Sequence, residues 1–116
     1  MKRKSIVTEF DDISAFSGAP AQARHHLIFG RGLRELAEED HLWIPLTHAE
    51  HNMNPNGQRW QVHENAPAEA LSRIAGQLAW EKEYIANELS VTEEFKKIIY
   101  KEAREEFRRR YGQSYL

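Results

Sequence analysis

The chain has 116 residues, 41% of them hydrophobic and 29% charged, which is enough for one small domain with a modest core. It contains no cysteine, so disulfides, thiolate zinc sites and thiol nucleophiles are excluded. A net charge of −2, from 16 basic and 18 acidic residues, excludes a protein that holds nucleic acid by bulk charge alone.

Hydropathy argues against a membrane protein. No apolar run approaches the ~20 residues that a membrane helix needs. The basic start of the chain, MKRKSIVTEF, runs into acidic residues without an apolar stretch. We therefore expect no signal peptide, no membrane contact and a cytoplasmic location.

The first half of the chain predicts two short strands. Residues 1–23 form an irregular N-terminal segment, and residues 24–29 form a strand that ends at Gly30. One or two helical turns are expected over residues 33–37, and a second strand over residues 41–47.

A short helix and a loop complete this half. Pro45 within the second strand favours an edge position. Thr47 is placed to cap a short helix over residues 48–51. Residues 52–62 are expected to be a loop, because Asn-Pro and Asn-Gly favour turns.

The second half predicts two helices that pack as an antiparallel hairpin. Pro67 suits the first turn of the first helix. Ser90 and Glu93 stand in capping-box register for the second helix, with Thr92 as a rival cap, and Gly112 is placed to end it. Apolar residues at helical spacing predict the buried faces. These residues are Leu71, Ile74, Leu78, Ile85 and Leu89 in the first helix, and Phe95, Ile98, Ile99, Ala103, Phe107 and Tyr111 in the second.

The expected fold is therefore α+β and forms a single domain over residues 1–116. A short β-hairpin plus helix over residues 24–65 packs against a C-terminal helical hairpin over residues 66–116.

All six histidines lie in one third of the chain, which indicates a site. They are His25, His26, His41, His48, His51 and His63. Imidazole is the commonest metal-binding side chain and the usual acid–base group near neutral pH.

The expected elements place these histidines differently. His25 and His26 point to opposite faces of a strand, so one can bind a metal while the other stays unligated. His48 and His51 share one side of the short helix. If the two strands pair, this helix returns beside the first strand, and three imidazoles converge to within bonding reach of one metal.

Three stretches together resemble the HNH (His-Me finger, ββα-metal) endonucleases, most of all their small phage and prophage members. The stretches are His25-His26-Leu27-Ile28-Phe29-Gly30, Leu36-Ala37-Glu38, and Ile44-Pro45-Leu46-Thr47 running on to His51-Asn52. The chain end, with Tyr111-Gly112 and Tyr115-Leu116, is similar too. The motif covers residues 12–65 and implies a ββα-metal motif over residues 24–65.

The resemblance implies a role for each matching histidine. His25 and His51 would bind the metal, and His26 would be the general base. His63 is the candidate for a further metal ligand, with His48 as the rival.

The resemblance leaves the partner of the general base open. The family usually orients this histidine with an asparagine between the strands, and none stands there in this chain; Asn52, Asn65 or a backbone carbonyl would substitute. Arg24, Arg31 and Arg34 flank the site in sequence and are expected to hold phosphates.

Relatives often carry structural zinc on paired cysteines, and this chain has Ser14-Ala15-Phe16-Ser17 and Thr47 at those places. Structural zinc is therefore expected to be lost, and apolar packing to replace it. The side chains expected to supply that packing are Phe16, Leu27, Phe29, Trp43 and Trp60, together with the C-terminal helices.

The implied function is hydrolysis of phosphodiester bonds in nucleic acid, DNA rather than RNA, with one divalent metal ion. An imidazole ligand set suits Zn, Ni, Co or Mn, and Mg is admitted because phosphate and water would fill the open positions. A homodimer or a protein partner could deliver the substrate. If a phage encodes the chain, the bacterial host cytoplasm is its expected location.

Two other functions use the same residues. One is a catalytically silent HNH-like module that binds DNA or protein, such as a phage inhibitor of a host enzyme. The other is a zinc-binding adaptor, which would fill all four coordination positions where a catalytic site keeps one open.

Overall fold

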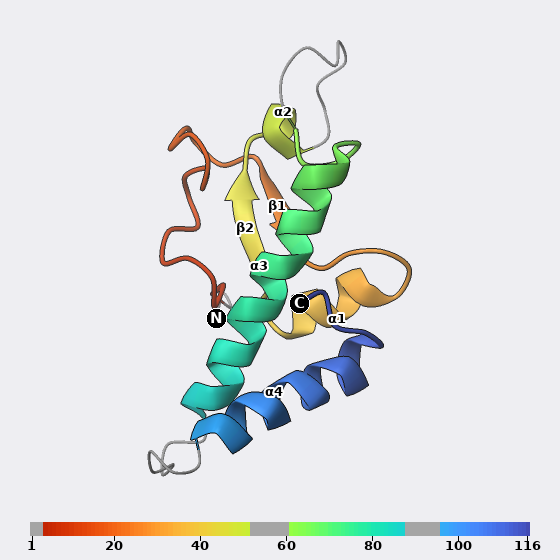
Figure 1. Cartoon of the computed structure of the whole chain (residues 1–116). Coiled ribbons are helices and arrows are strands. Elements are labelled where there is room, and N and C mark those ends of the chain that lie inside the picture. Colours follow the sequence, from red (N-terminus) through yellow and green to blue (C-terminus); the bar gives the residue numbers. More distant parts are fainter. Residues whose placement is uncertain (1–3, 52–60, 88–95) are drawn as a thin grey trace.

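The structure is a computed structural model that describes residues 4–51, 61–87 and 96–116. It confirms the expected α+β class, with a two-stranded antiparallel sheet, short helices and a C-terminal helical hairpin (Figure 1). The elements are β1 (Ala23–His26), α1 (Leu33–Glu39), β2 (Trp43–Leu46), α2 (His48–His51), α3 (Ala66–Ala86) and α4 (Lys96–Tyr111).

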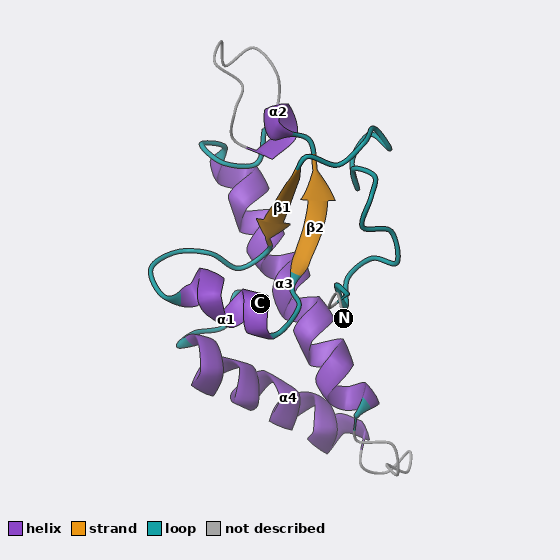
Figure 2. Ribbon diagram, turned by 180° about the vertical axis from the view of Figure 1, so that it is seen from behind, coloured by secondary structure: helices purple, strands orange, loops and turns teal. Residues whose placement is uncertain are grey.

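The long helix α3 organises the molecule, which measures 52 × 29 × 23 Å. The β-hairpin lies against its N-terminal half, and α4 crosses its C-terminal end (Figures 1 and 2). α1 lies between the hairpin and α4, and α2 is at the opposite end of the molecule from α4. Within the described ranges, no helix has the length and apolar content that crossing a membrane requires.

The two strands bring distant parts of the chain into register. β1 pairs antiparallel with β2, with His25 opposite Ile44 and His26 opposite Trp43. Side chains alternate along β1, so the two adjacent histidines leave it in different directions.

Both strands are shorter than the expected ranges 24–29 and 41–47. β1 ends at His26 because the chain then turns toward α1, with Gly30 at φ 121°. β2 begins late because His41 has a left-handed φ of 61°, which interrupts extended backbone.

Hydrogen bonds connect Ser14 and Thr47, which stand where relatives of the resembled family often carry structural zinc. Thr47 caps α2 as expected: its Oγ1 accepts from the Glu50 backbone N–H at 3.2 Å, and its own N–H donates to Glu50 Oε1 at 2.9 Å. The Ser14 hydroxyl donates to the same oxygen at 2.5 Å. Burial by itself would raise the pKa of Glu50, but hydrogen bonds from Ser14, Thr47 and Ser17 lower it.

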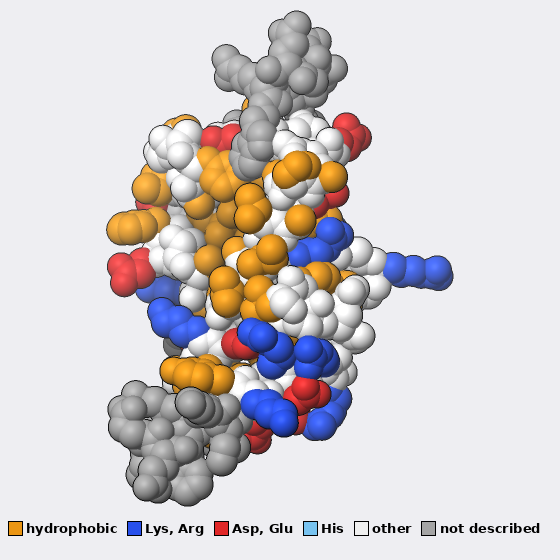
Figure 3. Space-filling view, viewed as in Figure 1, with side chains coloured by type: hydrophobic (Ala, Val, Ile, Leu, Met, Phe, Trp, Pro, Cys, Tyr) orange, Lys and Arg blue, Asp and Glu red, His pale blue; other side chains and the backbone are white. Residues whose placement is uncertain are grey.

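The buried face of α3 differs from the predicted one. Leu71 and Leu78 are 65% and 52% exposed, and hydrophobic side chains lie open along the outer face of this helix (Figure 3). The face that packs inward is small or polar. It consists of Ala68, Ser72, Gly76, Gln77 and Glu81.

The chain after β1 passes close to α3, and this explains why the small and polar face of the helix is buried and the leucines are exposed. A Cβ atom built on Gly76 would lie 2.8 Å from Ile28 Cγ1 and 3.0 Å from Leu27 Cβ. A leucine could not fit at this distance. Of the predicted stripe, Leu71 and Leu78 therefore lie on the outer face, while Ile74 and Ile85 are half-buried.

Gly76→Ala is expected to destabilise the protein by up to about 2 kcal/mol. Alanine gains about 1 kcal/mol in an ordinary helix, but here overpacking against Ile28 costs about 1–3 kcal/mol. Chemical denaturation measures the change in the free energy of unfolding. A variant that is more stable than the parent would show that helix propensity decides at this position and that the close packing does not.

The predicted face of α4 is confirmed where the structure describes it. Ala103, Phe107 and Tyr111 are buried, and Phe107 and Tyr111 share a core with Ile28 and Leu42. Gly112, at φ 89°, follows the end of α4 as expected. The other expected features of this turn lie outside the described residues or side chains. They are Leu89, Ser90, Thr92, Glu93, Phe95 and Ile98.

The predicted hairpin core is partly confirmed. Leu27 and Trp43 are each 3% exposed, but Phe16 is 46% exposed, so its core assignment is wrong. The turn after Ser14 directs Phe16 outward, and the Ser14 hydroxyl accepts the Phe16 N–H at 3.1 Å. Phe29 is half-buried, and Trp60 lies outside the described residues.

Candidate metal and catalytic centre

Three histidines from separate elements gather between the hairpin and α3. His25 comes from β1, His51 from the end of α2, and His63 from the segment before α3. Their ring centroids lie 4.7–5.1 Å apart, and one nitrogen from each lies within 4.8 Å of the others. Among the described residues, these three could hold one metal ion.

His25 presents an unprotonated nitrogen to this cluster. The Ser72 hydroxyl donates its proton to the Leu27 carbonyl at 2.7 Å, so the 2.8 Å contact between His25 Nε2 and Ser72 Oγ requires the imidazole to donate. The proton therefore sits on Nε2. Nδ1 keeps its lone pair and has no hydrogen-bond partner among the described residues, although it is buried. A metal ion would satisfy this atom.

His63 is oriented in a similar way by a carboxylate. Its Nδ1 lies 3.3 Å from Glu69 Oε2 at the first turn of α3, and its Nε2 lies 3.0 Å from His51 Nε2. Two imidazole nitrogens bound to one tetrahedral ion at ~2.0–2.1 Å would be ~3.3 Å apart, so the separation fits. A carboxylate behind a metal-binding imidazole fixes its tautomer and ring orientation.

Burial keeps two members of the cluster, His25 and His51, uncharged at neutral pH. Desolvation, reinforced by His51 and His63, lowers the pKa of His25 to about 3. Desolvation, with the charges of His63 and Arg34, lowers the pKa of His51 to about 4. Metal ions bind neutral imidazole, so His25 and His51 can bind without first losing protons.

The same shifts predict that the metal-free protein loses stability as the pH falls from about 6.5. Below this value His25 and His51 become protonated in the unfolded chain, whereas in the folded protein they stay neutral until about pH 3–4. His25 alone contributes a slope approaching ~1.4 kcal/mol per pH unit, and above about pH 6.5 this contribution is constant.

Urea unfolding in EDTA at about pH 5, 6 and 7 tests this slope, because ordinary carboxylates stay ionised in that window. His48→Gln, at an exposed histidine outside the cluster, is the matched control and should keep the slope. Equal free energies of unfolding at about pH 5 and 7 would contradict the buried, neutral state of His25.

His26 is held apart from the cluster by a different set of contacts. Its Nε2 lies 2.7 Å from Glu38 Oε2 on α1, and the Arg34 Nε–H donates to its Nδ1 at 3.4 Å. Burial would raise the pKa of Glu38, but the hydrogen bond to His26 and the charge of Arg24 lower it, so the carboxylate is ionised. The imidazole therefore carries its proton on Nε2 and keeps a lone pair on Nδ1.

The remaining expected site residues lie elsewhere. His48 is exposed and outside the three-histidine cluster, so the structure favours His63 over its rival. Asn65 does not reach His26, because its side chain accepts from the Ala68 N–H at 3.2 Å and caps α3. Asn52 lies outside the described residues.

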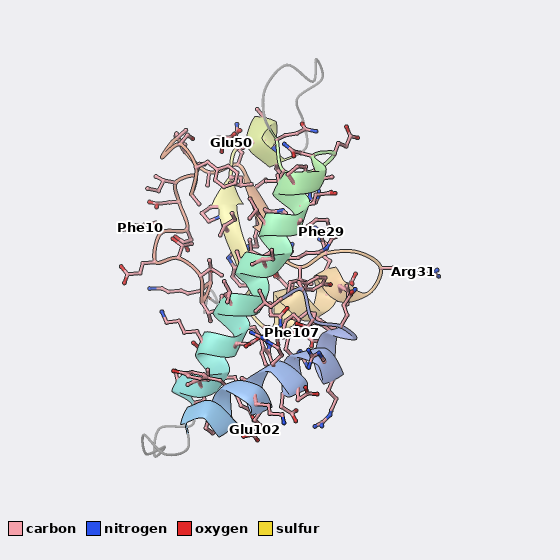
Figure 4. The ribbon with its side chains drawn as sticks, in the orientation of Figure 1. Phe10, Phe29, Arg31, Glu50, Glu102 and Phe107 are labelled. Atoms are coloured by element: carbon pink, nitrogen blue, oxygen red, sulfur yellow. The ribbon has the colours of Figure 1, made fainter. Side chains whose placement is uncertain are left out.

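The three expected phosphate-binding arginines have different surroundings. Arg24 pairs with Glu38 at 2.9 Å and stacks on Trp43, with its guanidinium 4.0 Å from the ring centre. Arg31 is exposed and points away from the molecule (Figure 4). Arg34 is the one that contacts a site residue, His26.

Three positioning residues were not predicted from the sequence: Glu38, Glu69 and Ser72. Glu38 lies inside the motif stretch Leu36-Ala37-Glu38, at the end of a helix that returns beside His26, and this was the available signal. Glu69 and Ser72 are separated by three residues on α3 and share a face, but nothing in the sequence shows which face meets the histidines.

Comparison with protein-family models, curated proteins and solved structures yields no match to this chain. The geometry of the site therefore carries the functional argument.

Proposed function

We propose that this chain is a metal-dependent endonuclease of the HNH (ββα-metal) type that hydrolyses phosphodiester bonds, in DNA rather than RNA. The observation that carries this proposal is the separation of neighbouring histidines. His25 joins His51 and His63 in a cluster that could hold a metal ion, while His26 is kept out of it and is hydrogen-bonded to Glu38. A structural zinc site would need no such second histidine.

His25, His51 and His63 would hold the divalent metal ion. When bound, it supplies charge neutralisation at the phosphoryl oxygens and at the departing 3′ oxygen. His51 and His63 are half-buried and reachable by solvent, which suits a site that must admit a phosphate group. Three protein ligands are typical of catalytic centres, whereas structural zinc centres have four.

His26 would act as the general base through Nδ1. A water molecule that replaces the long 3.4 Å contact from Arg34 gives its proton to this nitrogen while its oxygen attacks phosphorus, and the bond from phosphorus to the 3′ oxygen breaks. Nε2 keeps its proton throughout and continues to donate it in the hydrogen bond to Glu38. The Glu38 carboxylate would stabilise the imidazolium that forms, as a charged partner 2.7 Å away.

Arg34 is the best placed of the expected phosphate ligands. Its guanidinium lies beside His26, and its charge contributes to the lowered pKa of His51, so it faces the same space as both. Arg24 is already neutralised by Glu38. We therefore assign phosphate binding at the reacting group to Arg34.

A cleavage assay tests this function directly. Supercoiled plasmid, single-stranded DNA and RNA are incubated with protein in Mg, Mn, Ni, Co or Zn, with EDTA controls. We expect endonucleolytic products with at least one of these metals and none in EDTA. The same metal should raise the thermal unfolding temperature, because an ion that binds only the folded state stabilises it.

A comparison of His63→Ala with His48→Ala distinguishes metal binding at the three-histidine cluster from metal binding by any exposed histidine. We expect His63→Ala to weaken both metal-dependent stabilisation and cleavage, and His48→Ala to preserve both. Absence of cleavage with every metal, despite clear metal-dependent stabilisation, would instead favour a binding module or zinc adaptor.

A further inference from the structure

A hollow lies beside the histidine cluster. It has a volume of about 500 Å³, within the usual range for small-ligand sites. Its lining includes Phe29, Leu33, Arg73, Ile74, Gln113 and Tyr115. The hollow thus combines apolar and aromatic walls with one positive charge.

Phe29 is the wall that this hollow shares with the cluster. It follows β1 and lies beside α3 (Figure 4). Its ring centre is 4.8 Å from that of His63 and 5.7 Å from that of His25. A ligand group in the hollow is therefore separated from the candidate metal ligands by a single ring.

Arg73 supplies a positive charge that has no carboxylate partner among the described residues. Its guanidinium lies 4.1 Å from the centre of the Phe29 ring. Other arginines are neutralised by ion pairs. These are Arg24, Arg104, Arg108, Arg109 and Arg110. Arg73 is therefore able to bind an anionic group at the mouth of the hollow.

Buried hydrogen bonds fix the far wall, although it belongs to the end of the chain. Gln77 on α3 is wholly buried; its Oε1 accepts from the Tyr115 N–H at 2.6 Å, and its Nε2 donates to Ser114 Oγ at 2.9 Å. The Tyr115 ring packs edge-on against Phe107, with ring centres 6.1 Å apart. The hollow is thus bounded by fixed side chains on both sides.

We propose that this hollow binds an unpaired nucleobase next to the phosphodiester that is cleaved, with Arg73 contacting the adjoining phosphate. The inference rests on the proposed nuclease function and names its substrate class as single-stranded or locally unpaired nucleic acid. A base can enter an aromatic-lined hollow only when it has left its own stack. Aromatic walls accept any base, so little sequence preference is expected.

Binding measurements test the subsite without cleavage. His26→Ala protein with Mn²⁺ is titrated against fluorescent oligothymidylate, an abasic strand of equal length and a duplex of equal length, with fluorescence anisotropy as the readout. We expect oligothymidylate to bind about tenfold more tightly than the abasic strand, since stacking contributes ~1–3 kcal/mol per base. We also expect it to bind more tightly than the duplex.

Arg73→Gln should remove about tenfold of the oligothymidylate affinity, whereas Arg109→Gln should leave it unchanged. Arg109 is a matched control because its side chain is 73% exposed, pairs with Glu106 on its own helix α4 and does not line the hollow. Tyr115→Leu should lose affinity for oligothymidylate and keep affinity for the abasic strand, with thermal unfolding used to confirm that it folds.

Hydrolysis of bis(4-nitrophenyl) phosphate, which has no nucleobase, distinguishes a failure of the base subsite from a failure of the nuclease function. With His26 intact, Arg73→Gln should leave its kcat/KM unchanged and lower the kcat/KM for oligothymidylate. Two results would overturn the subsite. One is equal oligothymidylate affinity in Arg73→Gln and Arg109→Gln; the other is that His26→Ala protein binds oligothymidylate and the abasic strand equally tightly. Failure of the parent to hydrolyse any phosphodiester would overturn the nuclease function.

Discussion

His26→Ala is expected to lower the cleavage rate by about 10²–10⁴-fold, to background, while metal binding survives. The reason is that His26 lies outside the three-histidine cluster, with its Nε2 on Glu38 and its Nδ1 facing Arg34. Removal of this imidazole takes away the group that accepts the water's proton and leaves the candidate ligands in place. Plasmid cleavage measures the rate, and calorimetric titration of Mn²⁺ or Zn²⁺ measures metal affinity.

Two further variants separate loss of the general base from loss of the metal ion. His51→Ala should weaken both metal binding and cleavage, because His51 belongs to the cluster. Glu38→Gln keeps the size of the side chain that holds His26 but removes the charge that stabilises an imidazolium, so it should lower kcat without changing metal affinity. Parental nuclease activity in His26→Ala would end the general-base assignment.

Local rules predicted the histidine arrangement because they depend on short stretches of chain. Strand alternation separates His25 from His26, and Thr47 caps α2, which carries His51. Antiparallel pairing of the two strands then brings the end of β2, and with it α2, back beside β1. Each step involves elements of only a few residues, so the sequence contains enough information.

The orientation of α3 was not predictable in the same way. Its leucine periodicity indicates a buried face, yet Leu71 and Leu78 are exposed and the buried face contains Ser72 and Gly76. This choice depends on the close passage of Leu27 and Ile28, which are nearly 50 residues away in sequence. The polar face is used because it supplies the hydroxyl that sets the tautomer of His25.

The partner of the general base was missed for a related reason. Asparagines near the motif were the natural candidates, but Asn65 is used as a helix cap and Glu38 makes the contact with His26. α1 reaches β1 only because two left-handed glycines, Gly30 and Gly32, turn the chain back. That return is a tertiary feature, and the strand and helical turns expected within residues 24–37 do not contain it.

Asp40, at the C-terminal end of α1, joins the hairpin half of the molecule to the C-terminal helices. Its Oδ2 accepts from Trp80 Nε1 on α3 at 3.0 Å, and from Arg110 Nε and the Tyr111 hydroxyl on α4 at 2.6 and 2.7 Å. Burial and the hydrogen bond to Asp40 raise the pKa of Tyr111, so the phenol keeps the proton that it donates. One carboxylate oxygen therefore ties three elements together.

Asp40→Ala is expected to lower the free energy of unfolding by about 3–4 kcal/mol. A hydrogen bond to a charged group contributes about 1.5–3 kcal/mol, and the variant would also leave the buried Tyr111 hydroxyl and the half-buried Trp80 N–H without an acceptor. The matched control is Glu39→Ala, whose carboxylate is 66% exposed and pairs only with Arg110, so that it should cost less than about 1 kcal/mol. Urea denaturation at neutral pH measures both. If Asp40→Ala were no less stable than Glu39→Ala, packing of Phe107 and Ile28 alone would be holding the two halves together, and the three bonds at Asp40 would contribute nothing beyond what water offers the same groups.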